Sequence, residues 1–177
     1  MSHFELRCPQ YSRSRSADMS VEVCLDCGSP LDVAYLGASH TNGNAMPTPV
    51  HNPGLSVTLG EGDTPSVLLT NLSAKLPPMQ LFAKLEFLNP TGSFKDRGTA
   101  TMLSVAKEFG VKELVEDSSG NAGASVSAYA ARAGIKSHIF VPADAPEAKL
   151  RQIKAYGTTV HPIGGVRGDV TAAAIAY

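Results

Sequence analysis

Lys95 stands in a run whose residue types could support covalent chemistry. The turn Asn89-Pro-Thr-Gly-Ser93 precedes it, between a strand expected over 81–86 and a helix expected over 94–109. Lys95 would then lie in the first turn of a helix, at the carboxyl end of a parallel strand, where α/β sheets bind ligands. The helix dipole there favours the neutral amine that a Schiff-base lysine uses as its nucleophile. Taken alone, the position is more typical of a solvated surface lysine.

A second motif, Glu116-Asp-Ser-Ser-Gly-Asn-Ala-Gly-Ala-Ser125, also lies between an expected strand (112–116) and an expected helix (121–132). Its small residues let a ligand approach the backbone, and the start of a helix offers unpaired N–H groups to an anion such as a substrate carboxylate. The same residues are equally compatible with an ordinary helix cap at Ser119 or Asn121.

The elements that must position these motifs alternate along the second part of the chain. Further strands are expected over 137–141 and 158–161, and further helices over 146–156 and from residue 169. Strands that alternate with helices of this length predict right-handed βαβ units and a mostly parallel sheet. The last segment, 170–177, has no signal for a helix end, so we expect a truncated chain.

Residues 1–58 differ from the rest of the chain. They show little periodicity and are rich in Ser, Pro, Asn and Gly, which predicts loops. We therefore expect two parts, a loop-rich N-terminal segment over 1–58 and an α/β portion over 59–177.

Composition excludes several classes of protein. Fifteen basic and sixteen acidic residues leave a net charge of −1, so no nucleic-acid partner is expected. The chain contains no apolar run long enough to cross a membrane and begins with no signal-peptide pattern. Three cysteines are an odd number for a disulfide framework, which favours a reducing cytoplasm.

The two motifs together resemble those of a known family. Pro-Thr-Gly-Ser-Phe-Lys-Asp-Arg-Gly (90–98) and Ser-Ser-Gly-Asn-Ala-Gly (118–123), about one βα unit apart, are similar to the motifs of the threonine synthases, among the fold type II pyridoxal-phosphate enzymes (the tryptophan synthase β-like family). Leu59-Gly-Glu-Gly-Asp-Thr-Pro65 also matches, and the resemblance runs from about residue 55 to the end. It implies the parallel-sheet, three-layer α/β fold of that family, here truncated behind a loop-rich, zinc-ribbon-like segment.

The resemblance also implies roles for individual residues. Lys95 would be the catalytic residue, bound to pyridoxal 5'-phosphate as a Schiff base and moving protons once substrate displaces it. Asn121 would hold the phenolic oxygen of the cofactor, and Phe94 would pack near its ring or in the core. The substrate carboxylate would be bound by four residues, namely Ser118, Ser119, Gly120 and Ala122.

The implied activity is that of a lyase acting on a small amino-acid substrate. It would convert O-phospho-L-homoserine and water to L-threonine and phosphate, in a protein that is a homodimer at full length. Threonine dehydratases and related amino-acid synthases share much of the two motifs and stay open as alternatives. A truncated, non-catalytic binding module is a further alternative.

Two features depart from the family pattern. The family's glycine-rich loop for the cofactor phosphate comes later in the chain than residue 177. Ile163-Gly-Gly-Val-Arg-Gly168 is expected to be a strand-to-helix turn instead, because one glycine-rich turn is a weak signal. The hypothesis that follows is weak cofactor binding and no turnover by this polypeptide alone.

The cysteines form the second departure. Some threonine synthases begin with two Cys-x-x-Cys pairs that bind zinc. Here Cys24 and Cys27 form one pair, but Tyr11 stands three residues after Cys8 in place of a fourth thiolate. Tetrahedral structural zinc needs four ligands, so His3 or His40 would have to complete the set. We therefore expect no metal, and reduced, partly buried thiols.

Other polar residues fit structural roles better. Lys84 is expected in mid-strand, away from a cleft, paired with Glu86 or another carboxylate. Arg97 is expected to be a structural ion-pair partner. His138 and His161 lie among apolar strand residues and are expected to be hydrogen-bonded core or edge histidines.

Overall fold

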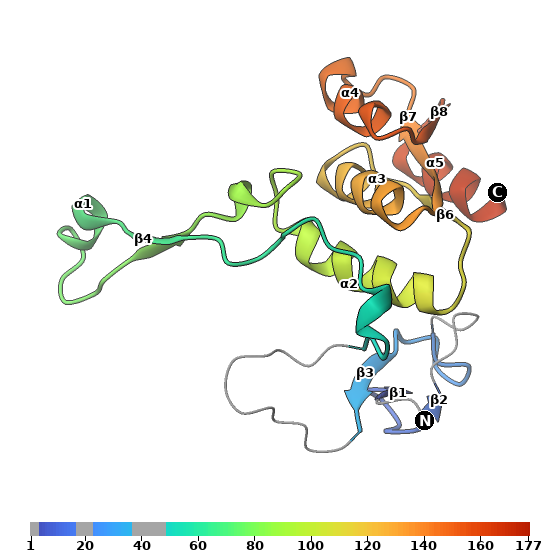
Figure 1. Cartoon of the computed structure of the whole chain (residues 1–177), viewed down its shortest axis with the longest axis horizontal. Coiled ribbons are helices and arrows are strands. Elements are labelled where there is room, and N and C mark those ends of the chain that lie inside the picture. Colours follow the sequence, from blue (N-terminus) through green and yellow to red (C-terminus); the bar gives the residue numbers. More distant parts are fainter. Residues whose placement is uncertain (1–3, 17–22, 37–48) are drawn as a thin grey trace.

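The structure, a computed structural model, describes residues 4–16, 23–36 and 49–177. Within these residues the strands form three separate sheets. Figure 1 shows an α/β body, an arm that projects from it, and a small N-terminal sheet below the body.

The body is built on a parallel sheet in the order β6-β7-β8. Its strands are β6 (Glu113–Glu116), β7 (Lys136–Pro142) and β8 (Thr159–Ile163), and the helices between them are α3 (Asn121–Ala133) and α4 (Glu147–Ala155). Helix α5 (Arg167–Ala176) follows β8. These elements confirm the strands and helices predicted beyond residue 112, and the Ile163–Gly168 segment is a strand-to-helix turn as expected.

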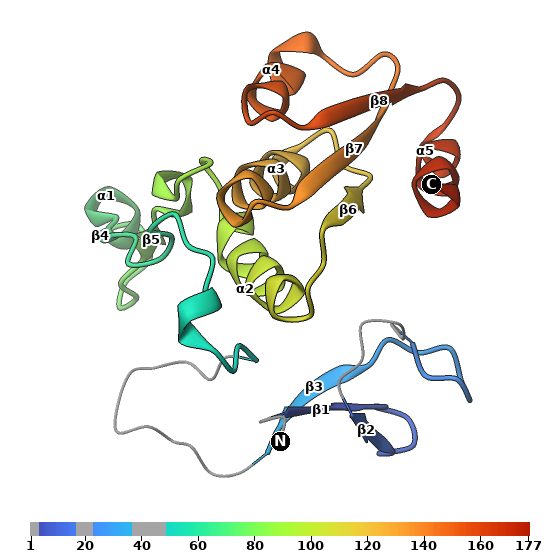
Figure 2. The same ribbon diagram turned by 45° about the vertical axis from the view of Figure 1, so that its right-hand side comes forward.

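Side chains that alternate along β7 give the body its three layers. Ile139 and Val141 are fully buried against apolar residues of α3 and α4. Phe140 points to the opposite face and packs against Val170 and Ala174 of α5. Successive strand residues face opposite sides of a sheet, so a central strand covered on both sides reads as a continuous apolar run. Figure 2 shows α3 and α4 on one side of this sheet and α5 on the other.

Helix α2 (Lys95–Glu108) packs outside α3 rather than on the sheet. The contact is apolar and includes the fully buried side chains of Leu103 on α2 and Tyr129 on α3. At about 25 cal/mol per Å², burial of such side chains is the main favourable term that fixes the two helices together. This packing sets the position of the α2 start, where Lys95 lies.

One expectation about the sheet is wrong. The strand predicted over 81–86 exists as β5 (Phe82–Lys84), but it pairs antiparallel with β4 (Ser66–Leu68) and forms no part of the parallel sheet. Lys95 therefore does not follow a parallel strand. The physical reason is that a short apolar run specifies an extended conformation, whereas its pairing partner depends on residues far away in the sequence.

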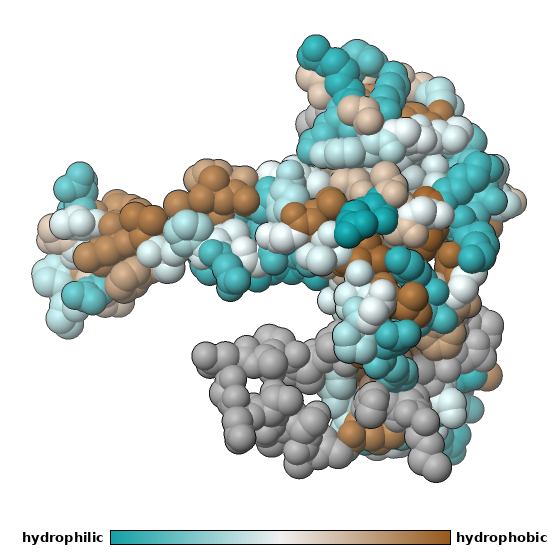
Figure 3. Space-filling model, viewed as in Figure 1, coloured by the Kyte–Doolittle hydropathy of each residue, from teal (hydrophilic) through white to brown (hydrophobic). Residues whose placement is uncertain are grey.

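Strands β4 and β5, with the short helix α1 (Thr70–Ser73) between them, make up the arm. Its apolar side chains are largely exposed, and Figure 3 shows them gathered along it. The exposed residues are Val67, Leu68, Leu72, Leu76, Met79 and Phe82. After the arm, the 3-10 turn η2 (Glu86–Leu88) leads into the turn before Lys95.

The N-terminal segment contains a three-stranded antiparallel sheet in the order β2-β1-β3. Its strands are β1 (Phe4–Arg7), β2 (Ser14–Ser16) and β3 (Asp32–Tyr35), and a 3-10 turn, η1 (Pro53–Leu55), precedes the arm. The division at residue 58 and the likeness of this segment to a zinc ribbon stay predictions.

Candidate active site

Lys95 and the start of α3 line one pocket of about 410 Å³. The pocket lies at the carboxyl end of β6, the edge at which α/β sheets bind ligands. Its lining contains Lys95, Ser118, Ser119, Gly120, Asn121, Ala122, Ala124 and Gln152. Six of the residues singled out from the sequence thus meet at one place, and the packing of α2 on α3 brings them together.

Phe94 does not line this pocket. Its ring is mostly exposed and lies 5.0 Å from the amine of Lys95. In the part of the chain that the structure describes, no carboxylate lies within ion-pair distance of that amine. The role of Phe94 at a cofactor ring stays a prediction.

The start of α3 has an unusual cap. The N-cap residue is Gly120, with no side-chain hydrogen bond to the first turn, so neither Ser119 nor Asn121 is the cap and that alternative is wrong. The first N–H groups of a helix have no partner within the helix, and an anion satisfies them well. Ser118 accepts a hydrogen bond from the Gly120 N–H (3.2 Å) and shapes the loop in front of the helix.

Gly123 explains how the 118–120 loop lies so close to the helix. A Cβ atom at this position would stand 1.9 Å from the carbonyl oxygen of Ser118. Only glycine allows this approach. The second glycine of the Gly-Asn-Ala-Gly sequence is therefore required for the loop that lines the pocket to lie against the helix.

Asp96 ties the Lys95 turn to α3. Its carboxylate is fully buried and accepts hydrogen bonds from the Thr91 N–H (2.7 Å), the Thr91 hydroxyl (2.5 Å) and the Ser125 hydroxyl (2.6 Å). An acidic residue in the first turn of a helix is common by itself, because it interacts favourably with the helix dipole. The hydrogen bond with Ser125 joins two helices, so no local pattern in the sequence predicts it.

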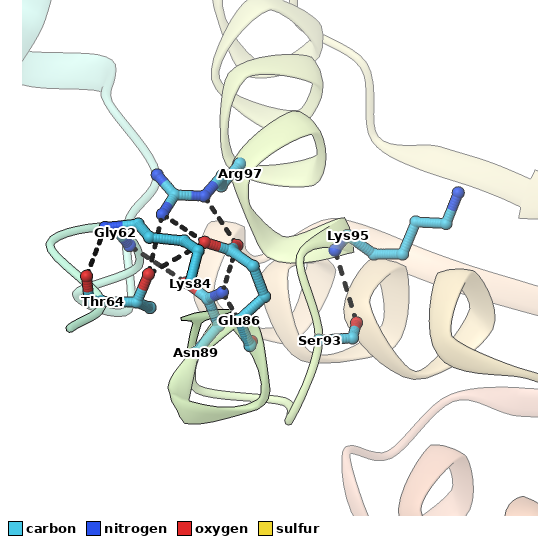
Figure 4. Close-up of polar contacts among 8 residues, drawn as sticks. All are labelled: Gly62, Thr64, Lys84, Glu86, Asn89, Ser93, Lys95 and Arg97. Atoms are coloured by element: carbon cyan, nitrogen blue, oxygen red, sulfur yellow. Dashed lines mark hydrogen bonds and ion pairs between the residues drawn. The ribbon is translucent and has the colours of Figure 1, made fainter. Parts of the chain in front are cut away.

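A second polar network holds the base of the arm (Figure 4). Glu86 accepts hydrogen bonds from both the Nε and Nη2 groups of Arg97 (2.8 Å each) and from the Thr64 hydroxyl (2.9 Å). Asn89 donates to the Glu86 carboxylate (3.0 Å) and accepts from the Gly62 N–H (3.1 Å). The hydrogen bonds from Arg97 and Thr64 lower the pKa of Glu86 to about 2. The structural ion-pair role expected for Arg97 is confirmed.

Lys84 points into this network and away from the pocket, as Figure 4 shows. Its amine donates to the carbonyl oxygen of Thr64. The carboxylate partner expected for Lys84 is therefore wrong, since the backbone of the neighbouring segment supplies the acceptor. Lys84 is no rival to Lys95 in this pocket.

Gln152 is a pocket residue that sequence reasoning missed. It comes from α4, and its amide donates to the Thr91 carbonyl oxygen (3.1 Å), which links the lysine turn to the far wall of the pocket. No local pattern marks it, because a glutamine on an amphipathic helix is ordinary. His138 and His161 lie outside the pocket and hydrogen-bond to each other (2.8 Å), as expected of core or edge histidines.

The carboxylates at the end of β6 differ in environment. Burial raises the pKa of Glu116, and the charge of Asp117 raises it further. Asp117 is paired with Arg167 (2.8 Å) and accepts from the Thr171 hydroxyl (2.5 Å), and these contacts lower its pKa. Asp117 thereby anchors α5 beside the loop that leads to the pocket.

Comparison with known proteins places the chain in a family. The family model for pyridoxal-phosphate dependent enzymes matches residues 57–177. A threonine synthase from Bacillus sp. (strain ULM1) is 44% identical over 118 residues, which are 66% of this chain and 33% of that protein. A threonine synthase from Synechocystis is 41% identical over 120 residues (66% and 31%). One from Methanosarcina acetivorans is 31% identical and aligns with 96% of this chain and 45% of its own length.

Solved structures agree on the fold. Maize serine racemase has a TM-score of 0.59 at 30% identity, over 64% of this chain and 34% of that one. The threonine deaminase isoform 2 of Solanum lycopersicum has a TM-score of 0.59 at 26% identity, over 64% and 31%. The chain spans about a third of the length of the first curated relatives that it matches. With its α/β fold, Lys95 and the glycine-rich start of α3, it belongs to the family of fold type II pyridoxal-phosphate dependent enzymes.

Proposed function

We propose that this chain contributes to a lyase of the threonine synthase kind, which converts O-phospho-L-homoserine and water to L-threonine and phosphate. The observation that supports this most is the meeting of Lys95 with the uncapped start of α3 in one pocket. The relatives named threonine synthase, at 41–44% identity, favour this reaction within the family. A homodimer and a cytoplasmic location stay predictions.

The pocket contains two groups that would hold the cofactor. Lys95 would hold pyridoxal phosphate covalently through its amine, and Asn121 would contact its phenolic oxygen. When bound, the cofactor withdraws electrons from the substrate and so stabilises the charge left by a departing proton. The Lys95 amine is suited to carry that proton, because the hydrogen bonds of Asp96 hold the start of α2, where Lys95 lies, in place.

The start of α3 is suited to bind the substrate carboxylate. Ser118, Ser119, Gly120 and Ala122 surround the unpaired N–H groups, and the positive end of the helix dipole points into the pocket. A carboxylate held there would share the pocket with the Lys95 amine.

A covalent labelling experiment tests the role of Lys95. The chain is incubated with pyridoxal phosphate, reduced with borohydride and digested, and the modified lysine is located by mass spectrometry. We expect label on Lys95 at less than one group per chain, and no phosphate release from O-phospho-L-homoserine by this polypeptide alone. Lys84→Ala is the matched control and should keep the label, whereas Lys95→Ala should lose it.

Label spread over surface lysines would contradict the assignment of Lys95. Stoichiometric label on Lys95 together with phosphate release would instead contradict the prediction that this chain by itself binds the cofactor weakly and does not turn over substrate. The two outcomes are distinguishable, because one concerns where the label lies and the other how much of it forms.

The reaction itself is best tested in a chimera. Residues 59–177 would replace the matching segment of the Bacillus threonine synthase, which is 44% identical. We expect phosphate release and L-threonine from O-phospho-L-homoserine, and neither from the same chimera with Lys95→Ala. The structural likeness to a threonine deaminase supports a second candidate, deamination of L-threonine. A folded chimera that forms only the 2-oxo acid from L-threonine would support that candidate instead.

A further inference from the structure

Two turns in the N-terminal segment have the same backbone conformation. In the first, the Ser12 N–H donates to the Cys8 carbonyl (2.8 Å) and the Cys8 N–H to the Arg13 carbonyl (2.9 Å). In the second, the Gly28 N–H donates to the Cys24 carbonyl and the Cys24 N–H to the Ser29 carbonyl, both at 2.8 Å. Ser12 and Gly28 are both left-handed, with φ of 52° and 68°. The two turns are therefore equivalent residue by residue.

The turns bring three thiols together. The sulfur atoms of Cys8, Cys24 and Cys27 all lie within 4.8 Å of one another, and those of Cys8 and Cys27 are 3.6 Å apart. Zinc–sulfur bonds of about 2.3 Å in a tetrahedron place neighbouring sulfurs about 3.8 Å apart. Cys8 and Cys24 are buried and Cys27 is exposed, and all three are free thiols. Their spacing fits a shared cation, whereas the count of cysteines in the sequence led us to expect no metal.

Tyr11 occupies the position in the first turn that Cys27 occupies in the second. Its side chain is 56% exposed, and the Arg13 guanidinium lies over its ring at 5.7 Å from the centroid. Arg13 also pairs with Asp26 of the second turn (2.6 Å) and so joins the two turns. His3 and His40, the other ligands considered from the sequence, lie outside the described residues.

We propose that Cys8, Cys24 and Cys27 bind a thiophilic divalent cation such as Zn²⁺ as three thiolates, with the fourth coordination position open to an external ligand. Binding would release the thiol protons to solvent. Closed tetrahedral sites with four protein ligands are structural, whereas three protein ligands leave a position for water or another small donor. The external ligand would be a nitrogen, sulfur or oxygen donor small enough to reach the Tyr11 side of the cluster.

The metal content of the whole chain is the first test. Protein purified with reductant and loaded with Zn²⁺ should retain one ion per chain after gel filtration. Cys27→Ser, at an exposed position, should lose it, whereas Leu25→Ala in the same turn, at a position 82% exposed, should keep it. A chain that retains no zinc, or that carries a Cys8–Cys27 disulfide in place of the metal, would overturn the proposal.

A second test adds a fourth protein ligand, which would close the open coordination position of the cation. Tyr11→Cys should complete a four-thiolate site and tighten zinc binding. Loss of an outer-sphere partner already changes metal affinity by about 10-fold to 100-fold, so a new direct ligand should add at least about tenfold. With Co²⁺ as the probe, added imidazole should shift the visible bands of the original chain and leave those of Tyr11→Cys unchanged.

Each failure in this second test has a definite meaning. If Tyr11→Cys binds zinc no more tightly, Tyr11 does not stand at the fourth position. If imidazole leaves the original chain's Co²⁺ spectrum unchanged, another group of the protein already fills that position. Either result would overturn an open site, even where one zinc ion per chain is found.

Discussion

Asp96 is the residue on which the placement of Lys95 depends most directly. Its fully buried carboxylate accepts three hydrogen bonds, two from Thr91 and one from Ser125. Hydrogen bonds to a charged group contribute about 1.5–3 kcal/mol each, and their donors would lose an acceptor in a dry environment. Asp96→Ala should therefore lower the free energy of unfolding by about 3 kcal/mol.

Thermal or urea unfolding measures this loss, with Asp144→Ala at an exposed position as the control. The same variant should also give less borohydride-fixed label on Lys95, measured under conditions where it is folded. Unchanged stability and unchanged label would mean that the Lys95 turn is held by other contacts.

Glu86 gives the base of the arm a dependence on pH. Its pKa is lowered from 4.5 to about 2 by hydrogen bonds from Arg97 and Thr64. A lowered folded-state pKa means that the stabilisation is complete above the unfolded value and is lost as pH falls from about 4.5 towards 2. Glu86→Gln should reduce the acid dependence of the unfolding midpoint in this window. Glu147→Gln, at an exposed position on α4, should retain it, and equal curves for both variants would contradict the role of Glu86.

At the scale of the elements, Gly123 allows the 118–120 loop to lie directly against α3. A methyl group there would stand 1.9 Å from the Ser118 carbonyl oxygen and 3.2 Å from Ile153. The loop or the helix would have to shift, and overpacking of this kind costs about 1–3 kcal/mol. Gly123→Ala should therefore destabilise the chain and alter the pocket, although alanine is the better helix former.

Gly98 in α2 is the matched control for this prediction. A Cβ atom there would meet no atom within 4 Å, so Gly98→Ala should stabilise the chain by up to about 1 kcal/mol. The unfolding midpoints of the two variants, each compared with that of the unchanged chain, test both predictions. Stabilisation by both substitutions would show that the 118–120 loop moves aside without cost.

For the whole molecule, the uneven distribution of contacts predicts uneven stability. Strand β7 lies in the centre of the sheet and is covered on both faces, whereas β4 and β5 pair only with each other among the described strands. A two-stranded ribbon is marginal in water by itself. Amide hydrogens of 66–68 and 82–84 should therefore exchange far faster than those of 138–141, by a factor on the order of a thousand or more.

Hydrogen exchange followed by mass spectrometry measures this difference. Because the exposed apolar residues of the arm could be covered by a second copy of the chain, the measurement should be repeated over a range of protein concentrations. Exchange in the arm as slow as in β7 at every concentration would contradict the expected instability.

No helix in the described part of the chain is long and apolar enough to cross a bilayer. This agrees with the apolar pattern of the sequence, in which short runs alternate with polar segments. The longest uninterrupted apolar run, 172–177 at the end of the chain, has only six residues.

Local sequence determined the elements of the body and the identity of the family. Apolar periodicity and turn glycines specify α2 to α5 and β6 to β8 within a few residues, because these signals act between near neighbours. The motifs around Lys95 and Asn121 were readable for the same reason, since each is a continuous stretch of chain.

Tertiary structure decided which of these residues meet. The pairing of β5 with β4, the hydrogen bond between Asp96 and Ser125, and the entry of Gln152 into the pocket all join residues distant in sequence. The convergence of Cys8 with Cys24 and Cys27 is of the same kind. Such contacts depend on how side chains of separate elements pack, and one sequence without its fold carries no local record of that packing.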